Sequence, residues 1–124
     1  MIKAVKFVSV PVKDQDAALA FWVERCGFEV STDQPMGAEM RGQRWIELRI
    51  GDAPTGIVLF TPPGHEERIG TFMNMSFVCD DVDKTYSEMA ARGVHFESPP
   101  HKEKWGTSAI FTDPDGNRFV LSSR

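Results

Sequence analysis

The sequence predicts an α+β domain of 124 residues that consists of two βαβββ modules in tandem. Two observations predict this fold. Strand-like and helix-like segments follow one another in the same order twice, and aligning Phe7 with Asn74 brings Asp14 onto Asp81 without a gap. Because this self-similarity, with a period of about 67 residues, extends over almost the whole chain, we interpret the two halves as related structural units.

We expect a single domain over residues 1–124, with module one at about 4–61, a connector at about 62–71 and module two at about 72–124. The connector is rich in proline, glycine and charged residues, as segments between structural units are. It suits both pairing of the modules within one chain and their exchange across a dimer, and we leave both open.

Composition excludes several kinds of partner. The formal charge is −4 and both signs are interspersed, so there is no basic face for nucleic acid and no polybasic membrane patch. No apolar run approaches the roughly 20 residues of a membrane span. We therefore expect a cytoplasmic protein that binds neither nucleic acid nor membrane. Cys26 and Cys79 belong to no CxxC or Cys/His cluster, which predicts reduced, buried thiols.

Module one begins with a strand in which Val8, Val10 and Val12 alternate with other residues, the period of a strand with one buried face. Asp14 is a suitable N-cap for a helix that Gly27 ends. A second strand starts at Phe28. The remaining expected elements are a loop or irregular strand end at 32–43, strands at 45–50 and 56–60, and a turn at 51–55.

Module two repeats this order. A strand at 74–79 leads to a helix that starts after Asp81 and ends at Gly93. Val94 and Phe96 mark a short strand, 99–105 is expected to be a loop, and 108–122 forms a closing hairpin. Its turn, Asp113-Pro114-Asp115-Gly116-Asn117, consists of residues that adopt the tight corners of a turn.

Each module places its helix on one sheet face and leaves the opposite face mixed in character. Such a face is too apolar to be bare and too polar for a dry core, which suits two curved mixed sheets that form a ligand cavity. An ordinary dimer or sheet-packing surface is the alternative. The open faces hold Phe7, Ser9, Pro11, Trp45, Glu47, Arg49, Val58, Asn74, Ser76, Val78, Ser108, Ile110, Thr112, Arg118, Val120 and Ser122.

The doubled pattern resembles the vicinal oxygen chelate superfamily, the group of glyoxalases, bleomycin resistance proteins and extradiol dioxygenases. The motifs that carry the resemblance are Val12-Lys13-Asp14, Phe21-Trp22, Cys26-Gly27-Phe28, Asp81-Val82-Asp83, Arg92-Gly93-Val94, Trp105-Gly106 and Asp113-Pro114-Asp115-Gly116-Asn117. Their order and spacing cover the chain from end to end, and the resemblance implies the glyoxalase/bleomycin resistance-like fold.

Metal-dependent members of that superfamily bind a divalent ion through four strand residues, usually His and Glu. By position, the resemblance puts these ligands at Phe7, Val58, Asn74 and Val120. Phe and Val offer no lone pair and Asn a weak neutral oxygen, whereas divalent cations need several charged or imidazole ligands. We therefore expect no metal site and no cofactor, and assign no catalytic residue.

Members without metal ligands resemble the bleomycin-binding proteins, which enclose a drug in dimer grooves lined by aromatic and polar groups. This implies a homodimer that binds a small, aromatic ligand without reaction. The predicted ligand-binding residues are Phe7, Trp45, Glu47, Arg49, Val58, Asn74, Ser76, Trp105, Arg118 and Val120. Glu47 and Arg49 are two apart on one strand, so either they pair with each other or they contact a ligand carboxylate or amine.

Two alternatives stay open. One is an enzyme of the same fold, either with Glu47 or His95 as a metal-free general base or with metal ligands that the alignment does not find. The other is a dimeric scaffold without a small ligand. His65 and His101 lie in polar loops and are expected to be solvated.

Overall fold

A computed structural model describes residues 1–124, which form two compact units, Met1–Ile69 and Gly70–Arg124. Along the chain, the first unit runs strand, helix and three strands, and the second repeats this order with one additional short strand. The prediction of an α+β fold with a doubled βαβββ pattern is confirmed. None of the helices combines the length and the apolar character that crossing a membrane requires.

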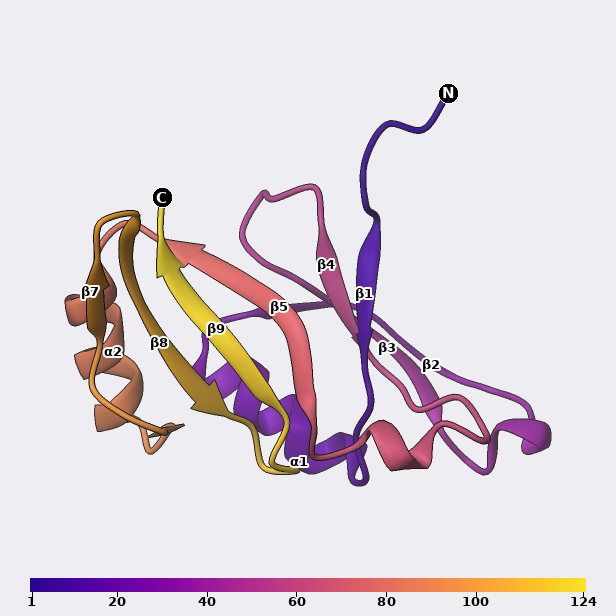
Figure 1. Ribbon diagram of the computed structural model, residues 1–124. Coiled ribbons are helices and arrows are strands. Elements are labelled where there is room, and N and C mark those ends of the chain that lie inside the picture. The colour runs from indigo at the N-terminus through magenta and orange to yellow at the C-terminus, as the bar shows by residue number, and fades with distance from the viewer. The chain divides into compact units, whose positions relative to one another are not determined.

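The first unit contains a four-stranded mixed sheet of β1 (Phe7–Val10), β2 (Glu29–Pro35), β3 (Arg44–Arg49) and β4 (Gly56–Leu59). The strand order is β1-β4-β3-β2, so β4 lies between β1 and β3 (Figure 1). β1 runs parallel to β4, and the other neighbours are antiparallel. The register of these strands decides which side chains share a face.

The helix of this unit starts where the sequence predicts. Asp14 caps α1 (Gln15–Ala20) through its Oδ1, which accepts hydrogen bonds from the backbone nitrogens of Asp16 at 3.0 Å and Ala17 at 3.1 Å. The expected regular helix is modified at its end, because η1 (Phe21–Arg25) is a wider π-helical turn. Gly27 follows with a φ of 81°, which only glycine adopts readily.

The core of the first unit lies on the helix-facing side of the sheet. α1 contacts β4, and the buried apolar residues include Ala18, Phe21, Trp22, Ile46, Leu48, Ile57 and Leu59. Val10 and Val12 are buried as expected, but Val8 is 36% exposed. β1 is the edge strand of its sheet, which leaves the start of this strand more accessible than the alternation alone predicts.

The polar segments of this unit also contain short helical turns. The segment predicted as a loop at 32–43 includes the end of β2 and the single-turn helix η2 (Ala38–Met40). A second such turn, η3 (Glu66–Arg68), lies in the predicted connector.

The second unit contains β5 (Phe72–Cys79), β6 (His95–Phe96), β7 (His101–Glu103), β8 (Gly106–Thr112) and β9 (Arg118–Ser123). The order is β5-β9-β8-β6, with β7 paired to β8. The expected loop at 99–105 is therefore wrong in part, because residues 101–103 form a hairpin strand with β8. Sequence propensity does not predict this strand, because its residues are polar and exposed and the strand is stabilised by hydrogen bonds to β8 rather than by burial.

The helix α2 (Val82–Ala91) covers one face of this second sheet and contacts β8 and β9 (Figure 1). Asp81 caps it by accepting a hydrogen bond from the Lys84 nitrogen at 3.1 Å, as predicted. Beneath the helix, the rings of Phe111 and Phe119 stack with their centroids 5.4 Å apart, and Phe77 contacts both. This aromatic cluster is the centre of the second core.

The predicted hairpin turn between β8 and β9 is confirmed. Backbone hydrogen bonds join Asp113 N to Asn117 O and Gly116 N to Asp113 O, each at 3.0 Å. Gly116 has a φ of 82°, the conformation for which the turn needs glycine. Cys26 and Cys79 form no disulfide, and both are half-buried rather than fully buried as expected.

Candidate functional site

The first open face is the side of the first sheet that is turned away from α1 and from the core of this unit. The register places Ser9, Val58, Glu47 and Thr32 in one row across all four strands. Alternation along the strands adds the remaining members of this face, which are Phe7, Glu29, Gln34, Trp45 and Arg49. Five predicted ligand-binding residues, Phe7, Trp45, Glu47, Arg49 and Val58, therefore share one surface.

An aromatic group lies at one end of the first open face. The half-buried ring of Trp45 meets Phe7 edge to face, with centroids 5.4 Å apart and an interplanar angle of 76°. Trp45 also contacts Phe60 at 5.6 Å, and Phe60 is almost fully buried. Because two other rings support the indole, Trp45 offers a pre-positioned aromatic surface of the kind that planar ligands contact.

Glu47 and Arg49 do not pair with each other. Glu47 Oε1 accepts a hydrogen bond of 3.2 Å from the indole Nε1 of Trp45. Arg49 instead forms an ion pair of 2.7 Å with Glu29, the residue directly opposite it on β2. This pairing raises the pKa of Arg49 above its ordinary value, chiefly through the hydrogen bond to Glu29. The positive charge of Arg49 is thus balanced by the carboxylate of Glu29 on the neighbouring strand, whereas Glu47 has no cationic partner.

Val58 occupies the centre of the row but has an exposed fraction of 0%. A ligand can therefore contact the surrounding side chains of the face, while Val58 acts as packing in this conformation. Its predicted role as a direct ligand contact requires a movement that exposes it.

The second open face is the side of the second sheet away from α2, and the register places Ser76, Arg118 and Val120 on it. Ser76, Val120 and Ile110 stand opposite one another in the register. Ser76 Oγ and Ser122 Oγ are hydrogen-bonded at 2.8 Å, and Arg118 lies 3.6 Å from Glu97. This surface combines polar and apolar groups, which is the mixed character that the sequence predicts.

Asn74 interrupts the regular course of β5. The pairing with β9 shifts register between Phe72 and Ser76, and Asn74 has a φ of 53°, in the left-handed region. Asn tolerates this conformation better than most residues. Such an irregularity re-aims side chains along an edge strand, so the sheet register does not fix the face on which the exposed Asn74 side chain lies.

Trp105 lies in the turn of the β7–β8 hairpin and is 68% exposed. The next residue, Gly106, has a φ of 142°, which favours glycine, and a Cβ at this position would also lie 2.5 Å from Ser123 Oγ. Ser123 Oγ also accepts a hydrogen bond from Thr107 N at 3.0 Å. The close approach of β9 therefore positions the hairpin that carries Trp105.

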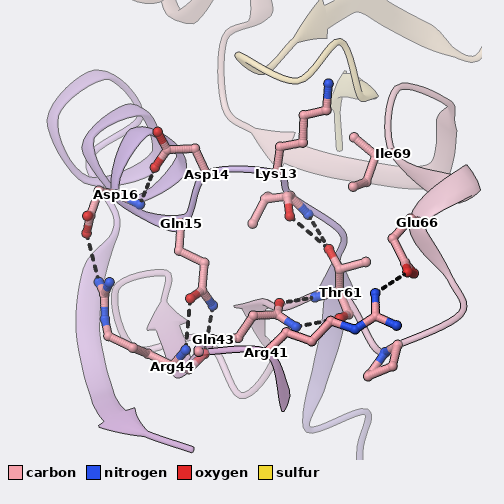
Figure 2. Close-up of a pocket in the computed structure, with 13 residues that line it drawn as sticks. Lys13, Asp14, Gln15, Asp16, Arg41, Gln43, Arg44, Thr61, Glu66 and Ile69 are labelled. Carbon is pink, nitrogen blue, oxygen red and sulfur yellow. Dashed lines mark hydrogen bonds and ion pairs between the residues drawn. The ribbon is translucent and has the colours of Figure 1, made fainter. Parts of the chain in front are cut away.

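The first unit also contains a polar cleft of about 520 Å³ that sequence reasoning did not find (Figure 2). It is defined by Val12, Lys13, Asp14, Gln15, Asp16, Arg41, Gly42, Gln43, Arg44, Thr61, Pro63, Glu66 and Ile69. None of the predicted ligand-binding residues lines it. The signal in the sequence is weak, since amide and hydroxyl residues scattered over three segments reveal a shared cleft only once the strands are paired.

Side-chain hydrogen bonds in this cleft hold the first unit together. The Gln15 amide donates to the carbonyls of Arg44 at 2.7 Å and Leu59 at 2.8 Å, and accepts from Arg44 N at 2.8 Å. Gln43 bridges to the backbone of Thr61 in the same two-way manner. Figure 2 shows the hydrogen bonds between Gln15 and Arg44 and those between Gln43 and Thr61. The Lys13 ammonium points away from Gln43 and Thr61.

Four of the charged side chains of the cleft form ion pairs, whereas Lys13 forms none and Asp14 caps α1. Arg41 bonds Glu66 at 2.9 Å, and Arg44 bonds Asp16 at 3.0 Å and Asp33 at 2.9 Å. The pKa of Arg44 is raised, mainly by its hydrogen bond to Asp33, and that of Glu66 is lowered, mainly by hydrogen bonds from backbone groups. The hydrogen bonds of Gln15 and Gln43 therefore join α1, β3 and the end of β4 along this cleft.

The four positions that correspond to metal ligands in the resembling superfamily do not fit a divalent cation. Phe7 packs against Trp45, Val58 is buried, Val120 stands opposite Ser76, and Asn74 supplies one neutral amide. No group of three or more His, Cys, Asp or Glu side chains is placed where it could hold a metal ion. The carboxylates and imidazoles that such a site needs are absent from these positions.

Sequence reasoning missed Glu29, Thr32 and Gln34 of the first open face, and Phe60, which supports Trp45 there. Phe60 continues the alternation Val58, Phe60 beyond the end of β4 and could have been found from that period. Glu29 could not, because its place opposite Arg49 depends on the β2–β3 register and on the shift between Val30 and Thr32.

Comparison with known proteins agrees with this fold. A family model described as the glyoxalase/bleomycin resistance protein/dioxygenase superfamily matches residues 4–121. The uncharacterized protein YetH of Bacillus subtilis is 36% identical over 121 residues, which cover 98% of each chain. A superfamily member from Sphaerobacter thermophilus is 32% identical, with a TM-score of 0.88 and coverage of 99% of this chain and 98% of that one.

A further solved structure is that of TnmS3, an antibiotic binding protein from Streptomyces. It is 35% identical, covers 98% of this chain and 96% of its own, and has a TM-score of 0.81. The family match spans nearly the whole chain, and its relatives share both sequence and fold with it. The chain belongs to the glyoxalase/bleomycin resistance protein/dioxygenase superfamily.

Proposed function

We propose that this protein binds a small planar aromatic molecule on the first open face and holds it without chemical change, as sequestration or resistance proteins do. The observation that carries the proposal is the Trp45 group. Its indole is half-buried, supported by Phe7 and Phe60, and fixed in orientation by its hydrogen bond to Glu47. An indole held in this way loses little freedom when a flat ligand stacks on it.

The relationship to TnmS3 supports this proposal. TnmS3 is an antibiotic binding protein, and its similarity to this chain extends over the full length of both. We extend the proposal to the second open face, where Asn74, Ser76, Arg118 and Val120 are predicted ligand contacts, and to the exposed Trp105. Apolar and aromatic lining with a few polar groups is the usual composition of small-molecule sites.

We also propose that binding needs no metal. The support is the chemistry of Phe7, Val58, Asn74 and Val120, which offer one weak donor between them. Metal analysis of protein purified without chelators is the test, with loading by Zn²⁺, Mn²⁺, Ni²⁺ and Fe²⁺ followed by dialysis. Retention of one equivalent of any of these would contradict the metal-free proposal and favour the enzyme alternative.

The proposed assembly is a cytoplasmic homodimer. One sheet face covers one side of a planar ligand, so enclosure needs a second surface, and a partner copy supplies one by symmetry. Sedimentation at micromolar concentration tests this, and a monomer across the concentration range would contradict it.

Calorimetric titration with a series of planar aromatic antibiotics and dyes tests the binding function. For a ligand that binds, Trp45→Leu should weaken affinity about tenfold, because it removes the aromatic contact and the ring's buried area. Tyr86→Leu is the matched control, since Tyr86 is a half-buried aromatic residue of α2, away from both open faces. Equal affinity of the Trp45 variant and the native protein would place the binding site elsewhere.

A further inference from the structure

We infer that the ligand of the first open face carries a positive charge, so that the preferred class is a planar aromatic cation with an amine or amidine group. This inference rests on the proposed function and adds to it the sign of the ligand's charge. It follows from how the charged side chains of the face are paired.

The register places three charged side chains on the first open face, namely Glu29, Glu47 and Arg49. The Arg49–Glu29 ion pair joins two of them at 2.7 Å, with both side chains 57% exposed. The guanidinium that could have attracted an anionic ligand is thus already matched by a carboxylate. The charge left over on the face is that of Glu47.

Glu47 is poorly compensated for a half-buried carboxylate. Its one side-chain hydrogen bond is the 3.2 Å contact from the Trp45 indole, and the residues beside it in the row are Val58 and Thr32. Arg44 precedes Trp45 in the sequence and is the next cationic residue after Arg49 in distance along the chain from Glu47. It forms ion pairs with Asp16 and Asp33 instead. A carboxylate in such surroundings attracts a cation more strongly than it does in open water.

The neighbouring indole strengthens the same preference. The face of an indole ring attracts cations through its quadrupole, and the hydrogen bond ties this ring to Glu47. A flat cation can therefore stack on Trp45 and place its charged nitrogen near Glu47. A neutral ligand would leave the carboxylate without a partner, and an anion would be repelled.

Calorimetric titration with three flat ring compounds of similar size tests this inference: proflavine as the cation, acridine as the neutral compound and anthracene carboxylate as the anion. At neutral pH we expect proflavine to bind at least about tenfold more tightly than acridine, the effect typical of one charge-assisted contact. Anthracene carboxylate should bind most weakly. The preference for proflavine should decrease as salt is added.

The variant Glu47→Gln should remove this preference and bring proflavine and acridine to similar affinity. Glu88→Gln is the matched control, because it makes the same change at an exposed position of α2 and alters the net charge equally. If the two glutamate variants behave alike, overall charge rather than Glu47 attracts the cation, and the inference is wrong.

The outcomes separate the two proposals. Binding of acridine or anthracene carboxylate as tight as that of proflavine would refute the charge preference and leave the proposed function standing. If none of the three binds at millimolar concentration, and the wider series of planar drugs also fails, both the function and the charge preference are wrong.

Discussion

The side chains of Asp113 and Asn117 are hydrogen-bonded to each other at 2.9 Å, and both residues are almost completely buried. Asp113 Oδ1 also accepts hydrogen bonds from the backbone nitrogens of Asp115 at 3.0 Å and Asn117 at 2.9 Å. Asn117 Oδ1 in turn accepts a bond of 2.7 Å from Gly70 N. Two residues of one turn thus hold both the β8–β9 hairpin and the first residue of the second unit.

Asn117→Ala should destabilise the protein by about 2–4 kcal/mol, because it removes the amide hydrogen bond to the buried Asp113 Oδ2 and leaves the Gly70 N–H without its acceptor. Urea unfolding followed by circular dichroism measures this change. Asn74→Gly is the control, since Asn74 is exposed and its positive φ suits glycine. A loss below about 1 kcal/mol for Asn117→Ala would show that water replaces these bonds.

The contribution of Asp113 to the stability of the protein should fall as pH rises from about 4 to about 6. Burial raises the pKa of Asp113 to about 6, with the hydrogen bonds from Asn117 and Asp115 opposing this effect. Between pH 3.8 and about 6, Asp113 binds a proton more strongly in the folded protein than in the unfolded chain. The free energy of unfolding that this proton contributes is therefore lost as pH rises through that range.

Unfolding free energies measured at intervals between pH 4 and 8 test this contribution. Asp113→Asn should flatten the slope, whatever its effect on overall stability, because it removes the titrating group. An unchanged slope in this variant would assign the pH dependence to other groups, such as the neighbouring Asp115.

Phe119→Ala should cost about 3–5 kcal/mol, the usual effect of removing a fully buried aromatic ring. Phe119 has an exposed fraction of 0% and stacks on Phe111 at the centre of the second core. Phe72→Ala makes the same change at a residue that is 39% exposed and should cost much less. Thermal unfolding of the two variants measures this difference in stability. Equal losses of stability would mean that the core collapses into the space that the Phe119 ring leaves.

Gln15→Ala should destabilise the first unit by about 2–3 kcal/mol, because the Gln15 amide satisfies backbone groups of Arg44 and Leu59 in the polar cleft. Gln34→Ala is the control, since Gln34 is an exposed residue of β2. Hydrogen exchange at Arg44 N is the local readout, and it should speed up in the Gln15 variant. If ligand binding were lost while stability remained unchanged, the cleft would be a binding site rather than a set of contacts that join α1, β3 and β4.

Much of the fold could be predicted because its signals are local. Asp14 and Asp81 cap their helices as expected, and the Asp113–Asn117 turn joins the two strands on either side of it. The strand at 101–103 was missed because it has no apolar alternation and exists through pairing with β8. The exposure of Val8 was missed because a sequence period does not reveal which strand lies at the sheet edge.

The candidate site divides in the same way. Alternation alone places Phe7, Trp45, Glu47 and Arg49 on one face, since side chains two apart on a strand point the same way. Which charges pair with which is a matter of cross-strand register. The β2 register puts Glu29 opposite Arg49, and this pairing leaves Glu47 with the indole of Trp45.

The sequence by itself determined the doubled βαβββ pattern, the helix caps, the closing turn and the lack of metal-binding residue types at Phe7, Val58 and Val120. These depend on residue identity and on contacts between near neighbours in the chain. Only the tertiary structure decided that Val58 is buried, that Arg49 is neutralised and that Glu47 has no cationic partner. Burial and charge pairing are properties of groups that folding brings together from distant parts of the chain.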